Sequence, residues 1–155
     1  MEKRFDLGGA FAEHETRVFT YFRRMAVDRD TARDLTQETL YRAFRNARRY
    51  RGDAPVGAWL LGIARNVFRE WLRKTIRDRE HPPEHVGFDP GPATETIDVE
   101  RAMARLDPEH REVLVLRFAL DLPGEDVAGI LGITHEAVRQ RVARAKAEFR
   151  RIWEE

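Results

Sequence analysis

The chain has 155 residues, of which 42% are hydrophobic and 35% are charged, and its formal net charge at pH 7 is +1. This length and composition suit one or two small domains with a packed core. Because there is no cysteine, a disulfide framework, a thiolate metal site and a cysteine nucleophile are all excluded. The N-terminal segment is too polar for a signal peptide and no apolar run reaches membrane-spanning length, so we expect a cytoplasmic protein without membrane insertion.

The charges are distributed unevenly along the chain. Residues 1–74 carry 16 basic and 10 acidic side chains, residues 75–100 carry 2 and 7, and residues 101–155 carry 10 of each. Within this last part, the basic residues gather after residue 138. Two basic segments separated by an acidic one favour two separate contacts with a polyanion.

Helical periodicity dominates the sequence, and strand signals are nearly absent. We expect a first helix at residues 10–26, a second at 31–50 and a third at 56–76. Their apolar faces can bury one common core, so these three helices are predicted to form a first small domain. The apolar stripe expected for the second helix is Leu35, Thr39, Leu40, Ala43, Phe44 and Ala47.

The segment at residues 78–93 differs from the rest of the chain because it holds four prolines and two glycines. Proline removes backbone donors and disfavours helix in its neighbours, so we expect an extended linker here. We therefore predict an all-α fold of two small helical domains, at residues 8–76 and 96–155, joined by a Pro/Gly-rich linker at residues 77–95.

The second domain contains a helix-turn-helix pattern. A short helix at residues 124–131 leads into a tight turn, after which Thr134 can cap a long last helix. Ala128 is small enough to let the two helices approach, Gly132 permits a left-handed turn, and Val138 fills the angle between the helices. This spacing favours DNA binding over the simpler interpretation of an ordinary amphipathic helix with a solvated basic face.

The last helix has two contrasting sides when it is placed on a helical wheel. One side carries Val138, Val142, Ala145 and Phe149. The opposite side carries Glu136, Arg139, Gln140, Ala143, Arg144 and Ala147. Arginine can bond guanine edges and glutamine can bond adenine edges, and small alanines between them would let the helix lie deep in a major groove. Arg150 and Arg151 lie further along, where phosphate contacts are expected.

The second helix of the first domain carries a polar pattern that a core alone does not require. One side of it holds Asp34, Gln37, Glu38 and Arg42. The simplest interpretation is a solvated face that the Glu38–Arg42 pair at i,i+4 spacing supports.

The third helix carries Arg65, Arg69 and Arg73 at i,i+4 spacing, where like charges repel one another. A negatively charged counter-surface would relieve this cost. Asn66 and Trp59 accompany the stripe, and basic residues interleaved with aromatic ones suit single-stranded nucleic acid. A purely structural role in the core is the alternative for the tryptophans.

Two long segments resemble the extracytoplasmic-function (ECF) subfamily of the bacterial sigma-70-type RNA polymerase sigma factors. Region 2 of that family is similar to residues 33–74, RDLTQETLYRAFRNARRYRGDAPVGAWLLGIARNVFREWLRK. Region 4 is similar to residues 106–149, LDPEHREVLVLRFALDLPGEDVAGILGITHEAVRQRVARAKAEF. The two segments stand in the order of the family, with a Pro-rich segment between them.

The resemblance implies a dissociable specificity subunit of RNA polymerase, which is not an enzyme and needs no cofactor or metal. It implies docking on the clamp helices of the largest polymerase subunit and on the flap of the second-largest subunit. Promoter DNA and an anti-sigma factor are the other partners that it implies.

The functional positions of the family can be transferred one by one to this chain. The matching polymerase-docking positions are Asp34, Leu35, Gln37, Glu38 and Arg42. The positions matching capture of the melted minus-ten strand are Arg51, Asp53, Trp59, Arg65, Asn66 and Arg69. The positions matching recognition of the duplex minus-thirty-five element are Thr134, His135, Arg139, Gln140, Ala143 and Arg144.

The chain departs from the family pattern at residues 122–128, where Pro123-Gly124 replaces the usual Ser or Thr cap and leaves the start of that helix open. A helix-turn-helix regulator that acts without polymerase would explain residues 124–151 equally well, but it gives no purpose to the polar side of the second helix. An enzyme acting on nucleic acid is a weaker alternative. The sequence has no Gly-rich phosphate loop, and its histidines lack metal-ligand spacing except for His81 and His85.

Overall fold

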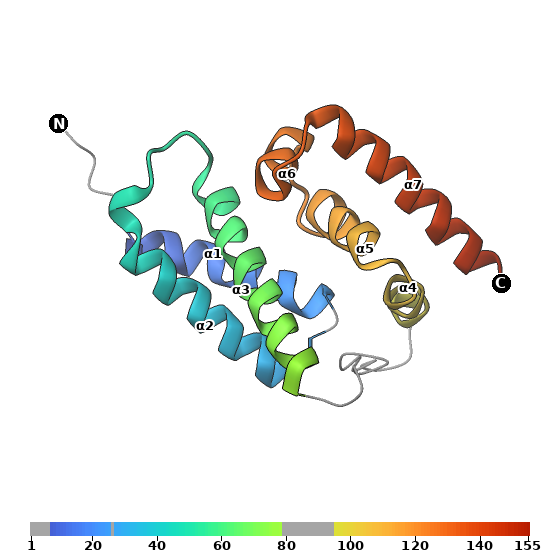
Figure 1. Cartoon of the computed structure of the whole chain (residues 1–155), viewed down its shortest axis with the longest axis horizontal. Helices are drawn as coiled ribbons and strands as arrows, with labels where there is room; N and C mark the ends of the chain where they lie inside the picture. The colour runs from blue at the N-terminus through green and yellow to red at the C-terminus, as the bar shows by residue number, and fades with distance from the viewer. Residues whose placement is uncertain (1–6, 26, 79–94) are drawn as a thin grey trace.

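The computed structural model describes residues 7–25, 27–78 and 95–155, and within these ranges the chain is all-α, as predicted (Figure 1). The elements in chain order are α1 Leu7–Arg24, α2 Arg29–Arg45, the 3₁₀ turn η1 Ala47–Arg49, α3 Val56–Asp78, α4 Glu95–Ala104, α5 Pro108–Leu114, the π-helical turn η2 Val115–Ala119, α6 Gly124–Leu131 and α7 His135–Glu154. Most of the linker predicted at 77–95 lies outside the described residues, while its ends belong to α3 and α4.

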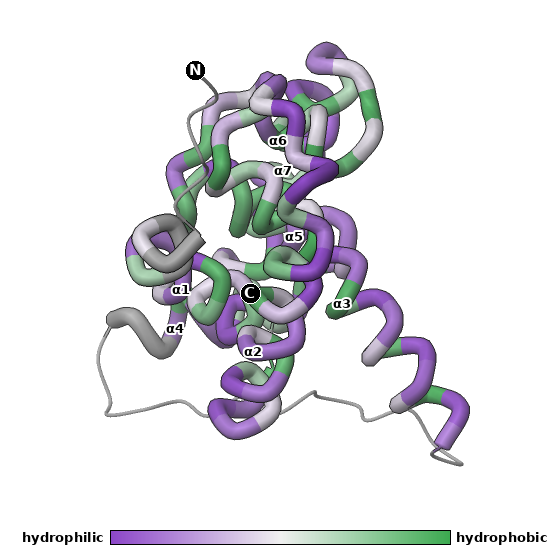
Figure 2. The backbone as a smooth tube through the Cα atoms, turned by 90° about the vertical axis from the view of Figure 1, so that its left-hand side faces the viewer, coloured by the Kyte–Doolittle hydropathy of each residue, from purple (hydrophilic) through white to green (hydrophobic). Residues whose placement is uncertain are grey.

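Helices α1, α2 and α3 pack into a three-helix bundle (Figure 1). Tyr21 and Phe22 of α1 and Leu60 of α3 are fully buried in its core, and the Tyr21 ring meets Phe22 and Phe68 edge to face. The Asp28 carboxylate caps α2 by accepting the Thr31 N–H at 3.2 Å, and this hydrogen bond lowers the pKa of Asp28. In Figure 2, the hydrophilic C-terminal turns of α3 extend past the packed helices.

The second helix differs from its prediction in two respects. It ends at Arg45 instead of Tyr50, because the Asn46 side chain and backbone both donate to the Arg42 carbonyl and the chain then enters the η1 turn. Phe44 was expected in the buried apolar stripe, but this prediction is wrong, because Phe44 is 62% exposed. The stripe that is buried ends on Ala43, and one further residue turns the side chain about 100° around the helix, away from the core.

Helices α4 to α7 form the second group (Figure 1). The Asp107 carboxylate accepts the Glu109 N–H at 3.0 Å, with Pro108 at the first helical position, so this capping arrangement sets the start of α5. This helix does not continue regularly beyond Leu114, because the Leu120 N–H bonds the Val115 carbonyl in a wider turn.

The two groups of helices pack against each other, which the sequence could not decide. Helix α3 contacts α6, and α1 contacts η2. The Tyr21 hydroxyl of α1 donates to Glu112 of α5 at 2.8 Å, and the Arg17 guanidinium donates to the Leu120 carbonyl. Burial, followed by the negative charge of Glu112, raises the pKa of Tyr21 well above its usual value.

Candidate nucleic-acid interface

Helices α6 and α7 form the predicted helix-turn-helix. Gly132 ends α6 with a left-handed φ of 68°, a conformation that glycine adopts without a steric penalty. The Thr134 hydroxyl accepts the Ala137 N–H at 3.0 Å and caps α7. Val138 is 1% exposed and fills the angle between the two helices. The turn therefore fixes the direction in which α7 leaves the domain.

The outward side of α7 is open to solvent. Its exposed residues are Thr134, His135, Glu136, Arg139, Gln140, Ala143, Arg144 and Ala147. The Arg139 guanidinium pairs with Glu136 at 2.8 Å, but both side chains are more than half exposed, so solvent weakens this pair. Arg139 thus stays available to a partner, and the predicted minus-thirty-five positions lie together on one surface.

His135 explains the unusual start of α6. A Cβ atom added at Gly124 would lie 2.5 Å from the His135 Nε2 atom, so the imidazole ring occupies the space that a side chain would need. Pro123 precedes α6 with extended backbone and makes no side-chain cap. The glycine at the first position of α6 therefore leaves room for His135, and α6 spans the predicted residues 124–131.

The predicted minus-ten positions lie along the loop before α3 and on α3 itself, but they differ in accessibility. Arg51, Asp53, Asn66 and Arg69 are exposed. Trp59 is partly buried, with its ring centroid 4.9 Å from that of Tyr50. Arg65 is also partly buried, and its Nε atom donates to Glu112 of α5 at 3.1 Å.

A groove of about 680 Å³ lies beside three of these positions. Asp53, Trp59 and Asn66 line one side of it, and Glu125 and Asp126 of α6 line the other. The second group of helices therefore places carboxylates opposite the predicted single-strand surface.

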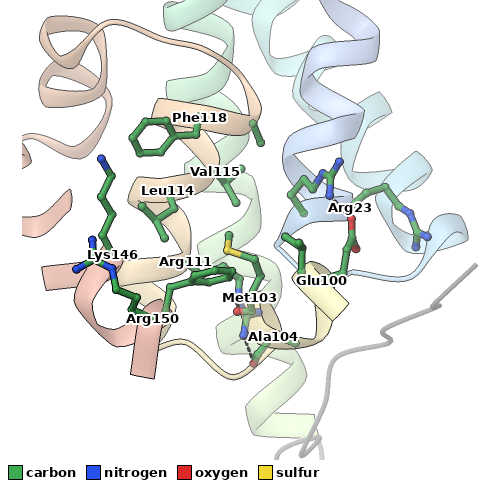
Figure 3. Close-up of a pocket in the computed structure, with 14 residues that line it drawn as sticks. Arg23, Glu100, Met103, Ala104, Arg111, Leu114, Val115, Phe118, Lys146 and Arg150 are labelled. Carbon is green, nitrogen blue, oxygen red and sulfur yellow. Dashed lines mark hydrogen bonds and ion pairs between the residues drawn. The ribbon is translucent and has the colours of Figure 1, made fainter. Parts of the chain in front are cut away.

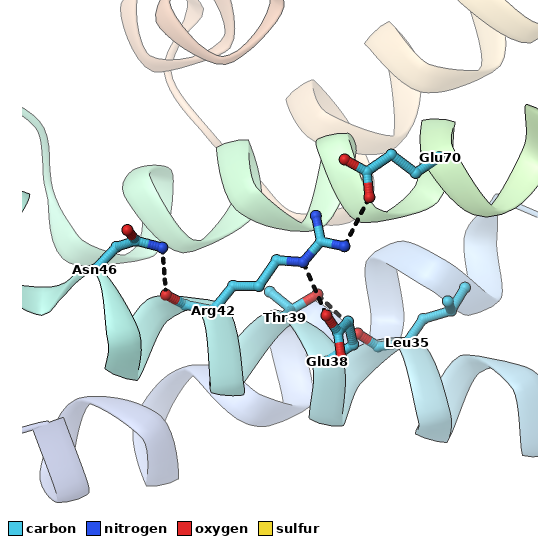
Figure 4. A network of polar contacts seen from close by, with 6 residues as sticks. All are labelled: Leu35, Glu38, Thr39, Arg42, Asn46 and Glu70. Atoms are coloured by element: carbon cyan, nitrogen blue, oxygen red, sulfur yellow. Dashed lines mark hydrogen bonds and ion pairs between the residues drawn. The ribbon is translucent and has the colours of Figure 1, made fainter.

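The predicted docking positions on α2 surround one arginine. Arg42 donates to Glu38 at 2.9 Å and to Glu70 of α3 at 2.6 Å, so it ties α2 to α3 (Figure 4). The hydrogen bond from Arg42 lowers the pKa of Glu70. Asp34 and Gln37 are exposed, like Glu38.

Leu35 differs from the other docking positions because it is 8% exposed. Its side chain packs in the hydrophobic core beneath α2. The sequence interpretation missed two exposed aromatic residues on the same helix, Tyr41 and Phe44, which are 56% and 62% exposed. The Arg45 guanidinium lies 5.8 Å from the centre of the Tyr41 ring. The signal that could have identified these two exposed residues is the position of Phe44, a large aromatic residue directly after Ala43, where the buried stripe ends.

No cluster of three or more His, Asp or Glu residues in the described ranges could hold a metal ion. Among the helices of the same ranges, none is both long and apolar enough to cross a membrane.

Comparison with known protein families matches both halves of the chain. Residues 10–78 match the family model of sigma-70 region 2, and residues 96–149 match that of sigma-70 region 4. The helix-turn-helix and the first three helices thus correspond to two regions of one class of proteins, the sigma-70-type sigma factors.

Individual relatives narrow the class. The ECF RNA polymerase sigma factor SigM of Mycobacterium tuberculosis is 32% identical over 96% of this chain and 78% of that protein. RNA polymerase sigma factor YlaC of Bacillus subtilis is 25% identical over 97% of this chain and 94% of YlaC. The protein named Probable RNA polymerase sigma factor RfaY of Xanthomonas campestris is 31% identical over 81% of this chain, which spans only 35% of RfaY. The chain belongs to the ECF family of RNA polymerase sigma factors.

Solved structures share the fold. Sigma factor RpoE in complex with the anti-sigma factor NepR from Bartonella quintana has a TM-score of 0.81 and 22% identity, with 96% of this chain and 97% of that chain covered. CnrH in complex with the cytosolic domain of CnrY has a TM-score of 0.75 and 24% identity, with 96% and 87% covered. At these identities, the likeness establishes the arrangement of helices alone.

Proposed function

We propose that this chain binds core RNA polymerase and directs it to specific promoters, with residues 8–76 and 96–155 as its two functional domains and residues 77–95 as the linker. The proposal rests on family membership together with one observation, the exposed polar side of α7 beside a buried helix-turn-helix core. A bacterial sigma factor acts in the cytoplasm, which agrees with the location expected from the sequence.

In this proposal, α7 recognises the minus-thirty-five element as duplex DNA. Arg139 and Gln140 lie near the N-terminus of the helix, where side chains of a recognition helix contact base edges. Ala143 keeps the surface low between them and Arg144. Thr134 and His135 lie beside the turn, where phosphate contacts are expected.

The loop before α3 and the exposed side of α3 would hold the melted minus-ten strand. Trp59 offers an aromatic ring for a base to stack on, and Asn66 offers an amide that can pair with a base edge. Arg51, Arg65 and Arg69 would supply positive charge for the DNA backbone. Asp53 lines the groove together with Trp59 and Asn66.

The exposed side of α2 would dock on the clamp helices of the largest polymerase subunit, while the second domain would contact the flap of the second-largest subunit. Tyr41 and Phe44 strengthen this assignment, because exposed aromatic residues are typical anchors of protein interfaces. The Arg42 bridge to α3 keeps the helix that carries them in a fixed position.

An anti-sigma factor would occupy a second surface. A pocket of about 660 Å³ lies between α1, α4, α5, η2 and α7 (Figure 3). Its apolar lining includes Val99, Met103, Leu114, Val115, Phe118 and Phe149. Among the described residues, its charged lining is Arg23, Arg24, Arg111, Lys146 and Arg150 against Glu100. An apolar floor with a cationic rim suits an amphipathic helix with acidic polar residues.

This partner assignment can be tested with a synthetic amphipathic helix whose polar side is acidic. We expect the peptide to bind the chain and Phe118→Asp to abolish its binding, because the carboxylate would replace the exposed ring in the pocket. Undiminished binding of the peptide to Phe118→Asp would contradict the assignment.

The central experiment is run-off transcription with core polymerase on a promoter library. We expect initiation at a defined subset of promoters, and we expect the double variant Tyr41→Ala/Phe44→Ala to lose polymerase binding while keeping its helical content. A chain that binds DNA but not core polymerase at physiological salt would instead be the helix-turn-helix regulator considered from the sequence.

A further inference from the structure

One acidic side chain of the second helical group is buried against the first. Glu112 of α5 has a side chain that is 9% exposed. One carboxylate oxygen accepts the Tyr21 hydroxyl at 2.8 Å, and the other accepts the Arg65 Nε–H at 3.1 Å. Burying a carboxylate costs free energy unless charged or polar partners compensate for the lost water. Glu112 therefore favours the packed arrangement only while both of its partners stay in place.

The arginine that Glu112 holds is one of the residues proposed to bind the minus-ten strand. The Arg65 side chain is only 18% exposed and its Nε–H is engaged by Glu112, so little of this guanidinium is accessible to a DNA phosphate in the packed arrangement. Glu125 and Asp126 of α6 add negative charge to the groove beside Trp59 and Asn66. Glu125 and Asp126 thus line the groove that a polyanion would have to enter, and like charges repel.

The contact between Glu112 and Arg65 and the carboxylates in the groove affect only one of the two proposed DNA-binding surfaces. The groove beside α3 is lined by residues of α6 and of the first group, and the exposed side of α7 contributes none of the residues that line it. Arg139 and Arg144 stay exposed in the same packed arrangement. In the packed arrangement the duplex-recognition side of α7 is thus exposed, whereas Arg65 of the single-strand surface is held by Glu112.

We propose that Glu112 is an autoinhibitory latch, which competes with the melted DNA strand for Arg65 and keeps α6 beside the groove until the two helical groups separate. This inference rests on the proposed function of the groove. A second contact across the same interface, from Arg17 to the Leu120 carbonyl, holds the groups together without involving a proposed DNA-binding residue. The two contacts allow the latch to be weakened in two independent ways.

The expected effect follows from the population of the open state. When only a small fraction of molecules is competent to bind, the apparent dissociation constant exceeds the intrinsic one by the inverse of that fraction. A variant that opens most molecules should therefore bind single-stranded DNA about tenfold more tightly if the parent chain is about 10% open.

The test uses the full chain, which has no cysteine of its own. Two cysteines introduced at the exposed positions Asp30 and Glu154 carry a fluorescent donor and acceptor, and energy transfer reports the distance between the helical groups without polymerase or DNA. Binding to a pool of random-sequence single-stranded oligonucleotides is measured in parallel. The variants are Glu112→Gln and Arg17→Ala.

The matched control is Glu109→Gln, which makes the same change on the same helix. The Glu109 side chain is 72% exposed, and its long 4.0 Å contact with Arg141 lies within the second group. We expect Glu112→Gln and Arg17→Ala to lower energy transfer and to tighten single-strand binding about tenfold, with Glu109→Gln unchanged. If Glu112→Gln fails to fold, Arg17→Ala carries the same test.

Two results would overturn the latch: unchanged energy transfer in both folded variants, or opening that leaves single-strand affinity unchanged. Absence of run-off transcription by the parent chain would overturn the proposed function alone, because the energy-transfer measurement does not depend on polymerase.

Discussion

The polar sides of α3 and α7 were predicted by the same rule, yet the structure treats them differently. Both helices carry arginines at helical spacing behind a buried apolar side. On α7, Arg139 and Arg144 remain exposed. On α3, Arg65 is paired with a carboxylate from the other half of the chain. Helical spacing therefore determines which residues face away from the core of their own domain, but it does not determine what another domain places over them.

The largest effect on the α7 surface is expected from a substitution in the buried core beneath it. Val138→Asp would put a carboxylate without a partner into a site that is 1% exposed, at a cost on the order of 3 kcal/mol of folding free energy or more. We expect the thermal unfolding midpoint to fall and specific duplex binding to disappear. Ala147→Asp is the control, because it adds the same charge on the exposed side of the same helix and should leave the midpoint nearly unchanged. Equal midpoints for the two variants would contradict the packing role of Val138.

A smaller change tests sequence recognition alone. Arg139→Ala should cost about 1–3 kcal/mol of specific duplex binding and relax the minus-thirty-five preference, because a bidentate contact to a base edge is lost. Competition between promoter duplexes with single base-pair changes measures this preference. Arg151→Ala should instead weaken all duplexes by a similar factor. An unaltered preference in Arg139→Ala would show that the base-contacting side of α7 lies elsewhere.

The corresponding change on α3 should have the opposite profile. We expect Asn66→Ala to weaken single-strand binding and promoter opening by roughly 1 kcal/mol, the usual contribution of a hydrogen bond, without affecting duplex binding. Permanganate footprinting of the melted region on one promoter measures opening. Equal losses in duplex and single-strand binding would contradict the proposal that α3 binds the single strand and α7 binds the duplex.

Features that depend on local sequence patterns could be predicted, whereas contacts between distant parts of the chain could not. The three helices of the first group, the Asp107-Pro108 start and the Gly132 turn depend on local periodicity and capping, and all were predictable. The exposure of Phe44 was missed because a helix stripe has no sharp edge in the sequence. The pairing of Glu112 with Tyr21 and Arg65 joins positions 91 and 47 residues apart, so no local pattern could reveal it.

A last comparison separates Glu112 from Glu148, the carboxylate that α7 presents to the start of α5. Glu148 accepts the Asp107 N–H at 2.7 Å and contacts the His110 Nδ1 atom, so both of its partners belong to the second group. We expect Glu148→Gln to lower the free energy of unfolding by about 1 kcal/mol, because a charge-assisted contact becomes a neutral one. Energy transfer between the two helical groups should stay as in the parent, in contrast to Glu112→Gln.

The pH dependence of this loss has a definite sign. Burial alone would raise the pKa of Glu148, but the Asp107 N–H and His110 outweigh it and the net pKa is lowered. A carboxyl group with a lowered pKa in the folded state stabilises the fold above its unfolded-state pKa, and this contribution disappears as the pH falls through the folded-state value. Chemical unfolding of the parent and Glu148→Gln should therefore differ at neutral pH and converge in acid. A difference that grows in acid would mean that Glu148 is not the anionic partner of α5.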